Sequence, residues 1–157
     1  MSRPRNVSPL LRLLAIAGVF ASIFCSSTAC AAGPQKALRL TAAEWRAIQA
    51  VVTKQMNAFR LDDGDAAFSL TSPGVRQAFE SANNFMEMVR TEYGAVYRPR
   101  TYRFLKPAVF DGEPVQPVQV IALDGAVSIA AFSLERQPDR SWRISGCRLL
   151  ESKQFAT

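Results

Sequence analysis

Two adjacent carboxylates and three tyrosines are the residues of this chain whose types suit proton-transfer chemistry. Asp62 and Asp63 stand side by side, and Tyr93, Tyr97 and Tyr102 follow later in the chain. A carboxylate can act as a general base, and a phenol can donate a hydrogen bond to a developing oxyanion. Asp62, Asp63 and Tyr97 are therefore candidate catalytic residues. The alternative, which we favour, is that the two aspartates cap a helix by accepting hydrogen bonds from its free backbone amides.

A segment rich in arginine and tyrosine follows the helical half of the chain. Guanidinium groups bind carboxylate or phosphate through two parallel hydrogen bonds. Tyr93, Arg98, Arg100 and Tyr102 are therefore candidate ligand-binding residues. We favour a structural alternative, in which Arg98 forms a poorly solvated ion pair with Asp62 or Asp63. The other basic side chains then only solvate the surface of a strand.

The sequence contains no histidine and three cysteines, and Cys147 is the one that lies beyond the N-terminal region. A single thiol can form neither an internal disulfide nor a zinc site. With no histidine to act as its base, Cys147 is expected to be a small buried residue and not a nucleophile. We therefore expect no metal site and no cofactor.

Residues 1–31 have the features of a secretory signal peptide. Three arginines in the first 12 residues precede an uncharged apolar run over 13–25, and Ala29-Cys30-Ala31 fits the small-x-small cleavage pattern. The run is shorter than the ~20 residues that a membrane-spanning helix needs. We predict export, to a periplasm, with cleavage near Ala31 and no stable membrane insertion afterwards. Lipidation of Cys30 and an uncleaved membrane anchor are the alternatives.

Composition and charge narrow the classes of function. The 157 residues carry 19 Lys+Arg and 13 Asp+Glu, a formal net charge of +6. Loss of the three signal arginines leaves +3, an ordinary charge for solubility, which argues against a nucleic-acid partner. This length favours one domain. We expect a flexible lead-in over 32–40, one domain over 41–152 and a tail over 153–157.

Helix signals fill the first half of the mature chain. Thr41-Ala42-Ala43-Glu44 is a capping box, and an apolar stripe at helical spacing predicts a helix from there to about Arg60. The acidic segment 62–65 breaks this helix, and a short helix follows over 66–70. Ser72-Pro73 predicts the start of another helix, and a stripe from Phe85 to Tyr93 predicts one that ends near Gly94.

Strand signals fill the second half. We predict strands over 102–105, 118–123, 126–135 and 142–150, with a hairpin turn at Asp124-Gly125 and a turn over 137–140. Helices that are followed by antiparallel strands predict an α+β fold, with N-terminal helices packed on a curved antiparallel sheet.

The order of these signals resembles a bacterial family known as domain of unknown function 4864, within the nuclear transport factor 2-like superfamily. The matching features run from about Gln49 to Leu150. They are Ala58-Phe59, Asp62-Asp63, Ala67-Phe68, Ser72-Pro73, Phe79, Asn84-Phe85, Met88-Val89-Arg90, Tyr93, Val96-Tyr97-Arg98-Pro99, Phe104-Leu105, Gln119-Val120, Trp142, Ile144 and Gly146. The resemblance implies a cone-shaped fold whose open end often serves as a pocket. Some relatives in the superfamily are isomerases or dehydratases.

The sequence thus predicts an exported small domain that binds a small ligand or a partner protein, through a pocket or through an open sheet face. One alternative is a cofactor-free isomerase or dehydratase that uses Asp62 or Asp63 with Tyr97. Another is a structural module that forms a homodimer through its sheet. We favour a protein that is not an enzyme.

Overall fold

The computed structural model describes residues 38–151. The expected signal peptide (1–31), most of the lead-in and the tail (153–157) lie outside the described residues. Within residues 38–151, five helices come first: α1 (Ala42–Arg60), α2 (Gly64–Ser69), α3 (Pro73–Phe79), α4 (Ala82–Glu92) and α5 (Gly94–Tyr97). None of the helices in this part of the chain is long and apolar enough to cross a membrane.

Helix α1 begins at the predicted capping box. The Thr41 hydroxyl accepts from the Glu44 amide, and the Glu44 carboxylate accepts from the Thr41 amide at 2.8 Å. Its buried stripe follows the predicted spacing, with Ile48, Val52 and Met56 fully buried. This face of the helix packs against the sheet. Most of the apolar residues of α1 that belong to the core lie on this face.

Five antiparallel strands follow the helices: β1 (Thr101–Phe104), β2 (Ala108–Phe110), β3 (Glu113–Ile121), β4 (Val127–Arg136) and β5 (Trp142–Glu151). The strand order is β1-β3-β4-β5, and β2 pairs with the other end of β3. The predicted hairpin joins β3 to β4, where Gly125 has a φ of +87° that suits glycine. The chain therefore has the predicted α+β fold, helices followed by a curved antiparallel sheet.

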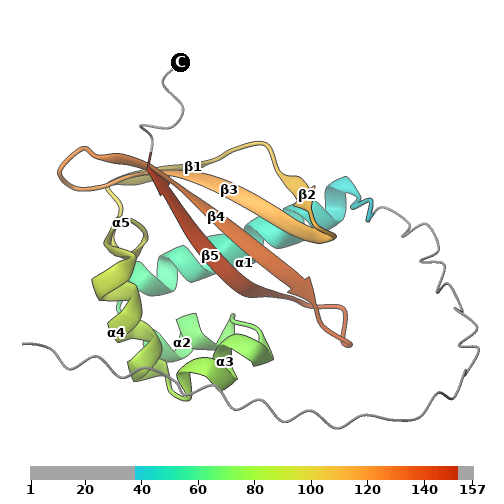
Figure 1. Cartoon of the computed structure of the whole chain (residues 1–157), viewed down its shortest axis with the longest axis horizontal. Helices are drawn as coiled ribbons and strands as arrows, with labels where there is room; N and C mark the ends of the chain where they lie inside the picture. The colour runs from blue at the N-terminus through green and yellow to red at the C-terminus, as the bar shows by residue number, and fades with distance from the viewer. Residues whose placement is uncertain (1–37, 152–157) are drawn as a thin grey trace, which may run out of the picture. The chain divides into compact units, whose positions relative to one another are not determined.

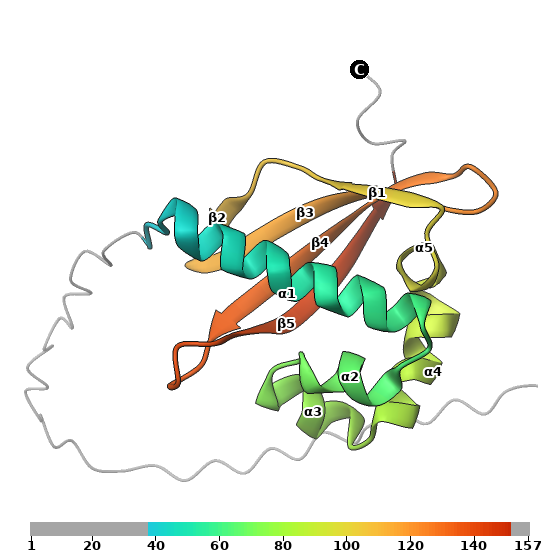
Figure 2. The same ribbon diagram turned by 180° about the vertical axis from the view of Figure 1, so that it is seen from behind.

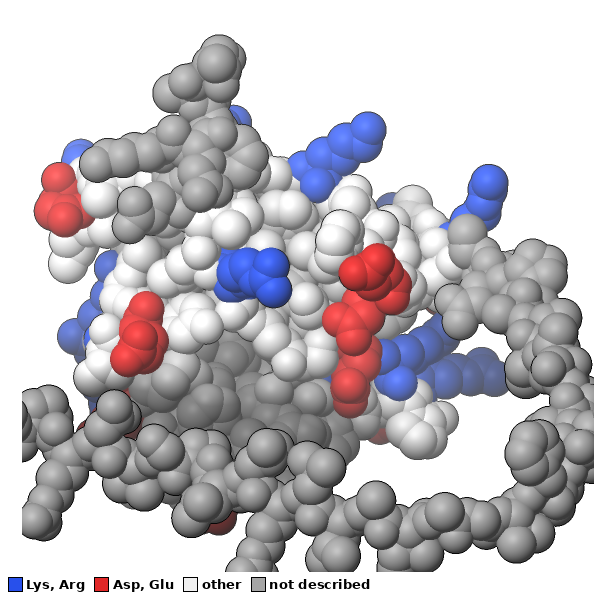
Figure 3. Space-filling model, in the orientation of Figure 1, with Lys and Arg blue, Asp and Glu red and all other residues white. Residues whose placement is uncertain are grey.

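The sheet has one covered face and one open face. Helix α1 runs across the inner face, and α2, α3 and α4 gather beside the β5 edge (Figures 1 and 2). Val118, Val120, Ala130 and Phe132 are buried on the inner face. The other face carries mostly uncharged residues with scattered charged side chains (Figure 3). The core therefore lies between α1 and the sheet.

The free edge of β5 is joined to the helical region by backbone hydrogen bonds. The amide of Ser72 donates to the Ile144 carbonyl at 2.9 Å, and the amide of Ile144 donates to the Leu70 carbonyl at 3.0 Å. An uncovered strand edge exposes unpaired backbone groups. The link between α2 and α3 covers part of that edge and holds these helices beside β5.

Three elements differ from the prediction. Helix α5 and strand β2 were not predicted, since they hold four and three residues and are too short to show a period. Strand β3 starts at Glu113 and not at Val118, although it contains two prolines. Pro117 lies where the partner strand is interrupted between β1 and β2, so its missing N–H costs no ladder bond there.

Candidate functional site

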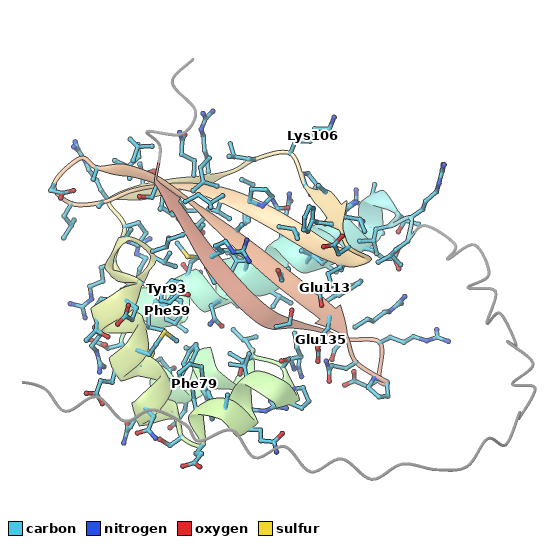
Figure 4. The ribbon with its side chains drawn as sticks, viewed as in Figure 1. Phe59, Phe79, Tyr93, Lys106, Glu113 and Glu135 are labelled. Atoms are coloured by element: carbon cyan, nitrogen blue, oxygen red, sulfur yellow. The ribbon has the colours of Figure 1, made fainter. Side chains whose placement is uncertain are left out.

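The helices and the sheet enclose a pocket of about 420 Å³. Helices α1, α3, α4 and α5 line one side, and β4 and β5 line the other. Its aromatic lining consists of Phe59, Phe79, Phe85, Tyr93 and Phe132. Figure 4 labels Phe59, Phe79 and Tyr93, which lie among the helices beside β5. The volume is within the range of about 300–1,000 Å³ that is typical of small-molecule sites.

The rest of the lining is mainly aliphatic, with a few polar side chains. Val75, Met88, Val89, Val96 and Ile144 contribute the aliphatic surface, and Gln55, Thr71, Glu92, Ser145 and Cys147 contribute the polar groups. Glu92 is the one charged residue in this lining, and it is exposed. The pocket is therefore an apolar space without a basic group in its described lining.

Gln55 and Ser145 supply the two buried side-chain oxygens that have no hydrogen-bond partner within the described part of the protein. The atoms are Gln55 Oε1 and Ser145 Oγ, and both residues line the pocket. Buried polar atoms in folded proteins are almost always paired. Two exceptions that line the same pocket indicate that it is suited to a molecule with polar groups of its own.

An irregularity in β5 accounts for the position of Ser145. Ser133 of β4 pairs with Gly146 and the next residue, Leu134, pairs with Ile144, so Ser145 is an extra residue without an opposite partner. A β-bulge of this kind redirects a side chain and is common beside functional sites. The bulge lets Ser145 line the pocket together with its neighbour Ile144.

Tyr93 and Cys147 form one wall of the pocket. The Tyr93 hydroxyl donates to the Cys147 carbonyl at 2.9 Å, and burial raises the pKa of this tyrosine. Burial also raises the pKa of the Cys147 thiol to about 12. The thiol therefore stays protonated at neutral pH, and a protonated thiol is a poor nucleophile.

A second, shallower hollow adjoins the pocket. Its lining includes Glu92, Tyr93 and Cys147, which it shares with the pocket, and it adds Arg148 and Leu149. This hollow lies between the end of α4 and the last strand. A carboxylate and a guanidinium thus line this hollow, while the rest of the pocket lining is uncharged.

Asp62, Tyr97 and Arg98 meet, but they are not among the residues that line the pocket. Asp62 accepts from the Tyr97 hydroxyl, from Arg98 at 2.5 Å and from Arg90 at 3.0 Å. These bonds, the one from Tyr97 above all, lower the pKa of Asp62. The Arg98 and Asp62 side chains remain 51% and 38% exposed. The expected ion pair is present, but the expectation that it is poorly solvated is wrong.

The remaining candidate residues are separate from one another. Asp63 caps α2 by accepting from the Ala66 amide at 2.9 Å, which is the capping role that we favoured. The same prediction for Asp62 is wrong, because its carboxylate accepts from Tyr97 and two arginines instead. Arg100 is exposed, and its backbone amide donates to Ile121. The Tyr102 ring packs edge-on against Phe104 at 6.0 Å. Of the seven candidates, Tyr93 alone is among the residues that line the pocket.

Gln55 and Ser145 were not predicted, although the sequence holds a signal for each. Gln55 falls on the buried face of α1 between Val52 and Phe59, where a polar residue is unexpected. Gly146 interrupts the last strand, and an isolated glycine in a strand suggests a bulge. Across residues 38–151, no three acidic or cysteine side chains are grouped to hold a metal ion.

Two solved structures from Catenulispora acidiphila are similar to the chain. The first has a TM-score of 0.46 and 15% identity, and covers 73% of this chain and 95% of its own. The second, solved in complex with S-DNPA, has a TM-score of 0.47 and 12% identity, and covers 73% and 98%. No curated protein sequence matches the chain.

A family profile also matches the chain. The profile described as "Domain of unknown function (DUF4864)" matches residues 41–157, which include nearly all of the described structure. The match contains α1, whose Gln55 lines the pocket, and β5, whose bulge places Ser145 there. The chain therefore belongs to the DUF4864 family.

Proposed function

We propose that this protein is an exported domain that binds a small, largely apolar molecule in the pocket between its helices and its sheet. The observation that carries the proposal is the lining of the pocket, in which aromatic and aliphatic side chains surround two polar atoms without partners. Pockets that bind small molecules share this composition, apolar walls with a few polar groups that fix orientation. The helices on a curved sheet also support membership of the nuclear transport factor 2-like superfamily.

The pocket is a better candidate than the open sheet face. Open-face residues such as Ile129 and Ala131 are partly covered by their own neighbours in the sheet. The pocket offers enclosed apolar surface, and burial of apolar ligand surface is favourable by about 25 cal/mol per Å². A small molecule therefore gains more from the pocket than from the open face.

A binding role fits the chemistry better than a carboxylate–tyrosine enzyme. Asp62 and Tyr97 are in contact, as such a mechanism needs, but two arginines also hold the carboxylate in its ionised form. Its lowered pKa makes it a weaker base. The one carboxylate in the described pocket lining, Glu92, is exposed to water and does not lie in the apolar interior of the pocket.

The experiment is a fluorescence titration with N-phenylnaphthylamine, an apolar dye that emits strongly in dry surroundings. We expect saturable binding to the mature protein. Val75→Phe, which fills the pocket from α3, should weaken binding by at least about tenfold, while folding is retained because Val75 is only partly buried. Val109→Phe makes the same change on the exposed strand β2 and should leave binding unchanged. Equal binding by all three proteins would contradict the proposal.

A further inference from the structure

We propose that the natural ligand is uncharged and carries a group that both donates and accepts hydrogen bonds, a hydroxyl or a primary amide, which is held inside the pocket by Gln55 and Ser145. This inference rests on the proposed function, because it names the chemical class of the molecule in the same pocket. It depends on three properties of the pocket interior: an unpaired amide, an unpaired hydroxyl and the absence of charge in the described lining.

The amide of Gln55 is the first property. The residue is 2% exposed on α1, and its Oε1 has no partner within the described protein. Gln116 provides the comparison, since it is also buried yet fully bonded. Its Nε2 donates to the Leu105 and Pro117 carbonyls at 2.9 Å, and its Oε1 accepts from Gln49 at 3.2 Å. Gln116 thus has a structural role, whereas Gln55 lines the pocket and its Oε1 is unpaired within the described protein.

The hydroxyl of Ser145 is the second property. A serine can both donate and accept, and a buried hydroxyl without a partner lowers stability. Ser145 lies in the bulge, so β5 lacks one regular residue pair with β4 at this position. The side chain of Ser145 lines the pocket at the same position. Gln55 and Ser145 come from α1 and β5, two elements that pack against each other. A group that donates to Gln55 and exchanges a hydrogen bond with Ser145 satisfies both atoms.

The absence of charge in the interior is the third property. The lining contains one charged side chain, the exposed Glu92, and burial keeps the Cys147 thiol protonated. A carboxylate or phosphate placed beside Gln55 would lose its hydration and gain no cation. Arg148 provides a guanidinium in the adjoining shallow hollow. An anionic group would therefore stay in that hollow, while a neutral group can enter the pocket.

The size of the pocket argues for an organic ligand and not for ordered water alone. One water occupies about 30 Å³ of liquid, and a buried water needs two to four polar partners. A volume of about 420 Å³ with mainly apolar walls exceeds what two such atoms can hydrate. A molecule with a polar head and an apolar body matches the remaining surface.

Three probes built on a ten-carbon chain with different head groups test this inference: decanol, decyl methyl ether and decanoate. Decanol donates and accepts, the ether only accepts, and decanoate is charged at neutral pH. Affinities are measured by displacement of N-phenylnaphthylamine at neutral pH. We expect decanol to bind about tenfold more tightly than the ether and about a hundredfold more tightly than decanoate.

Two variants assign the preference to the two residues. Gln55→Leu and Ser145→Ala should each reduce the ratio of ether to decanol dissociation constants toward one, while the ether itself binds as well as before or better. Gln77→Leu on the exposed side of α3 and Ser133→Ala on β4 are matched controls that should keep the wild-type ratio. Gln55→Leu should fold, because it replaces an unpaired buried amide with an apolar group of similar size. Ser145→Ala, which removes a single atom, gives the same test independently.

The outcomes separate this inference from the proposed function. Equal affinity for the three probes, or a head-group preference that survives in both variants, would overturn the inference and leave the apolar pocket in place. Tighter binding of decanoate would overturn it as well, and would place the head group at Arg148. If neither the dye nor any probe binds, both proposals fail.

Discussion

The hydroxyl of Tyr93 donates a hydrogen bond of 2.9 Å to the backbone carbonyl of Cys147, which lies 54 residues further along the chain. Tyr93 follows the last residue of α4, and Cys147 lies in β5. Both residues line the pocket and the shallow hollow that adjoins it. This bond therefore fixes the helical wall of the pocket to the wall that the sheet provides.

Removal of this bond should weaken the fold and loosen the pocket. Tyr93→Phe keeps the ring but leaves the Cys147 carbonyl without this donor, so we expect a loss of about 1 kcal/mol in the free energy of unfolding. Urea denaturation measures the change. Tyr102→Phe makes the same change on β1, outside the pocket lining, and should have a smaller effect. Equal stability of Tyr93→Phe and wild type would show that the bond contributes nothing.

Cys147 should make stability depend on pH in the alkaline range. Burial raises the thiol pKa from 9.0 to about 12, so the unfolded chain loses this proton first as pH rises. The contribution of the protonated thiol is fully present below pH 9 and is lost between pH 9 and about 12. The free energy of unfolding of wild type, measured relative to Cys147→Ala by denaturation, should fall across that window.

A chemical measurement checks the same thiol. In the native protein at pH 8, alkylation of Cys147 by iodoacetamide should be much slower than in the urea-unfolded chain, because almost no thiolate is present. Mass spectrometry follows the reaction. Similar rates in the two states would mean that the thiol is exposed and ionisable, which contradicts its position in the wall.

Asp62 should make stability depend on pH in the acid range. Its bonds with Tyr97 and the two arginines hold its pKa below the ordinary value of 3.8. Their contribution is therefore present above pH 3.8 and is lost as pH falls through the lower folded value. Wild type should be more stable than Asp62→Asn at neutral pH, and the difference should shrink below pH 3.8. Added salt should reduce it too, because the ion pairs are exposed.

The neighbouring aspartate is the matched control for that experiment. Asp63 caps α2, and asparagine caps a helix about as well as aspartate does. Asp63→Asn should therefore change stability little at neutral pH. A larger loss of stability from Asp63→Asn than from Asp62→Asn would reverse the roles that the structure gives to these two residues.

Local signals in the sequence were enough to predict most of the fold. Thr41 and Glu44 form the predicted capping box, and the stripe from Ile48 to Phe59 is the buried face of α1. Asp124 and Gly125 lie in the connection between the two long central strands, where a hairpin was predicted, although this connection spans residues 122–126 and not two residues. Each of these features depends on residues a few positions apart, which periodicity and turn chemistry describe well.

The pocket could not be predicted in the same way, because it depends on residues that are distant in sequence. Periodicity indicates that Phe79, Val89 and Phe132 face inward, but it does not distinguish residues that pack against each other from residues that surround a space. The prediction instead selected charged and hydroxyl-bearing residues. Asp62, Tyr97 and Arg98 do meet, but as an exposed cluster that is not among the residues lining the pocket.

A methyl-resolved NMR titration of the protein with decanol tests the central claim most directly. Binding in the pocket should shift the methyl signals of Val75, Met88 and Val89, which line it. It should leave those of Val109 and Leu123, which are exposed elsewhere, unchanged. The same titration of Val75→Phe should abolish the shifts at Met88 and Val89. Shifts confined to residues outside the pocket, or none at saturating decanol, would contradict the account.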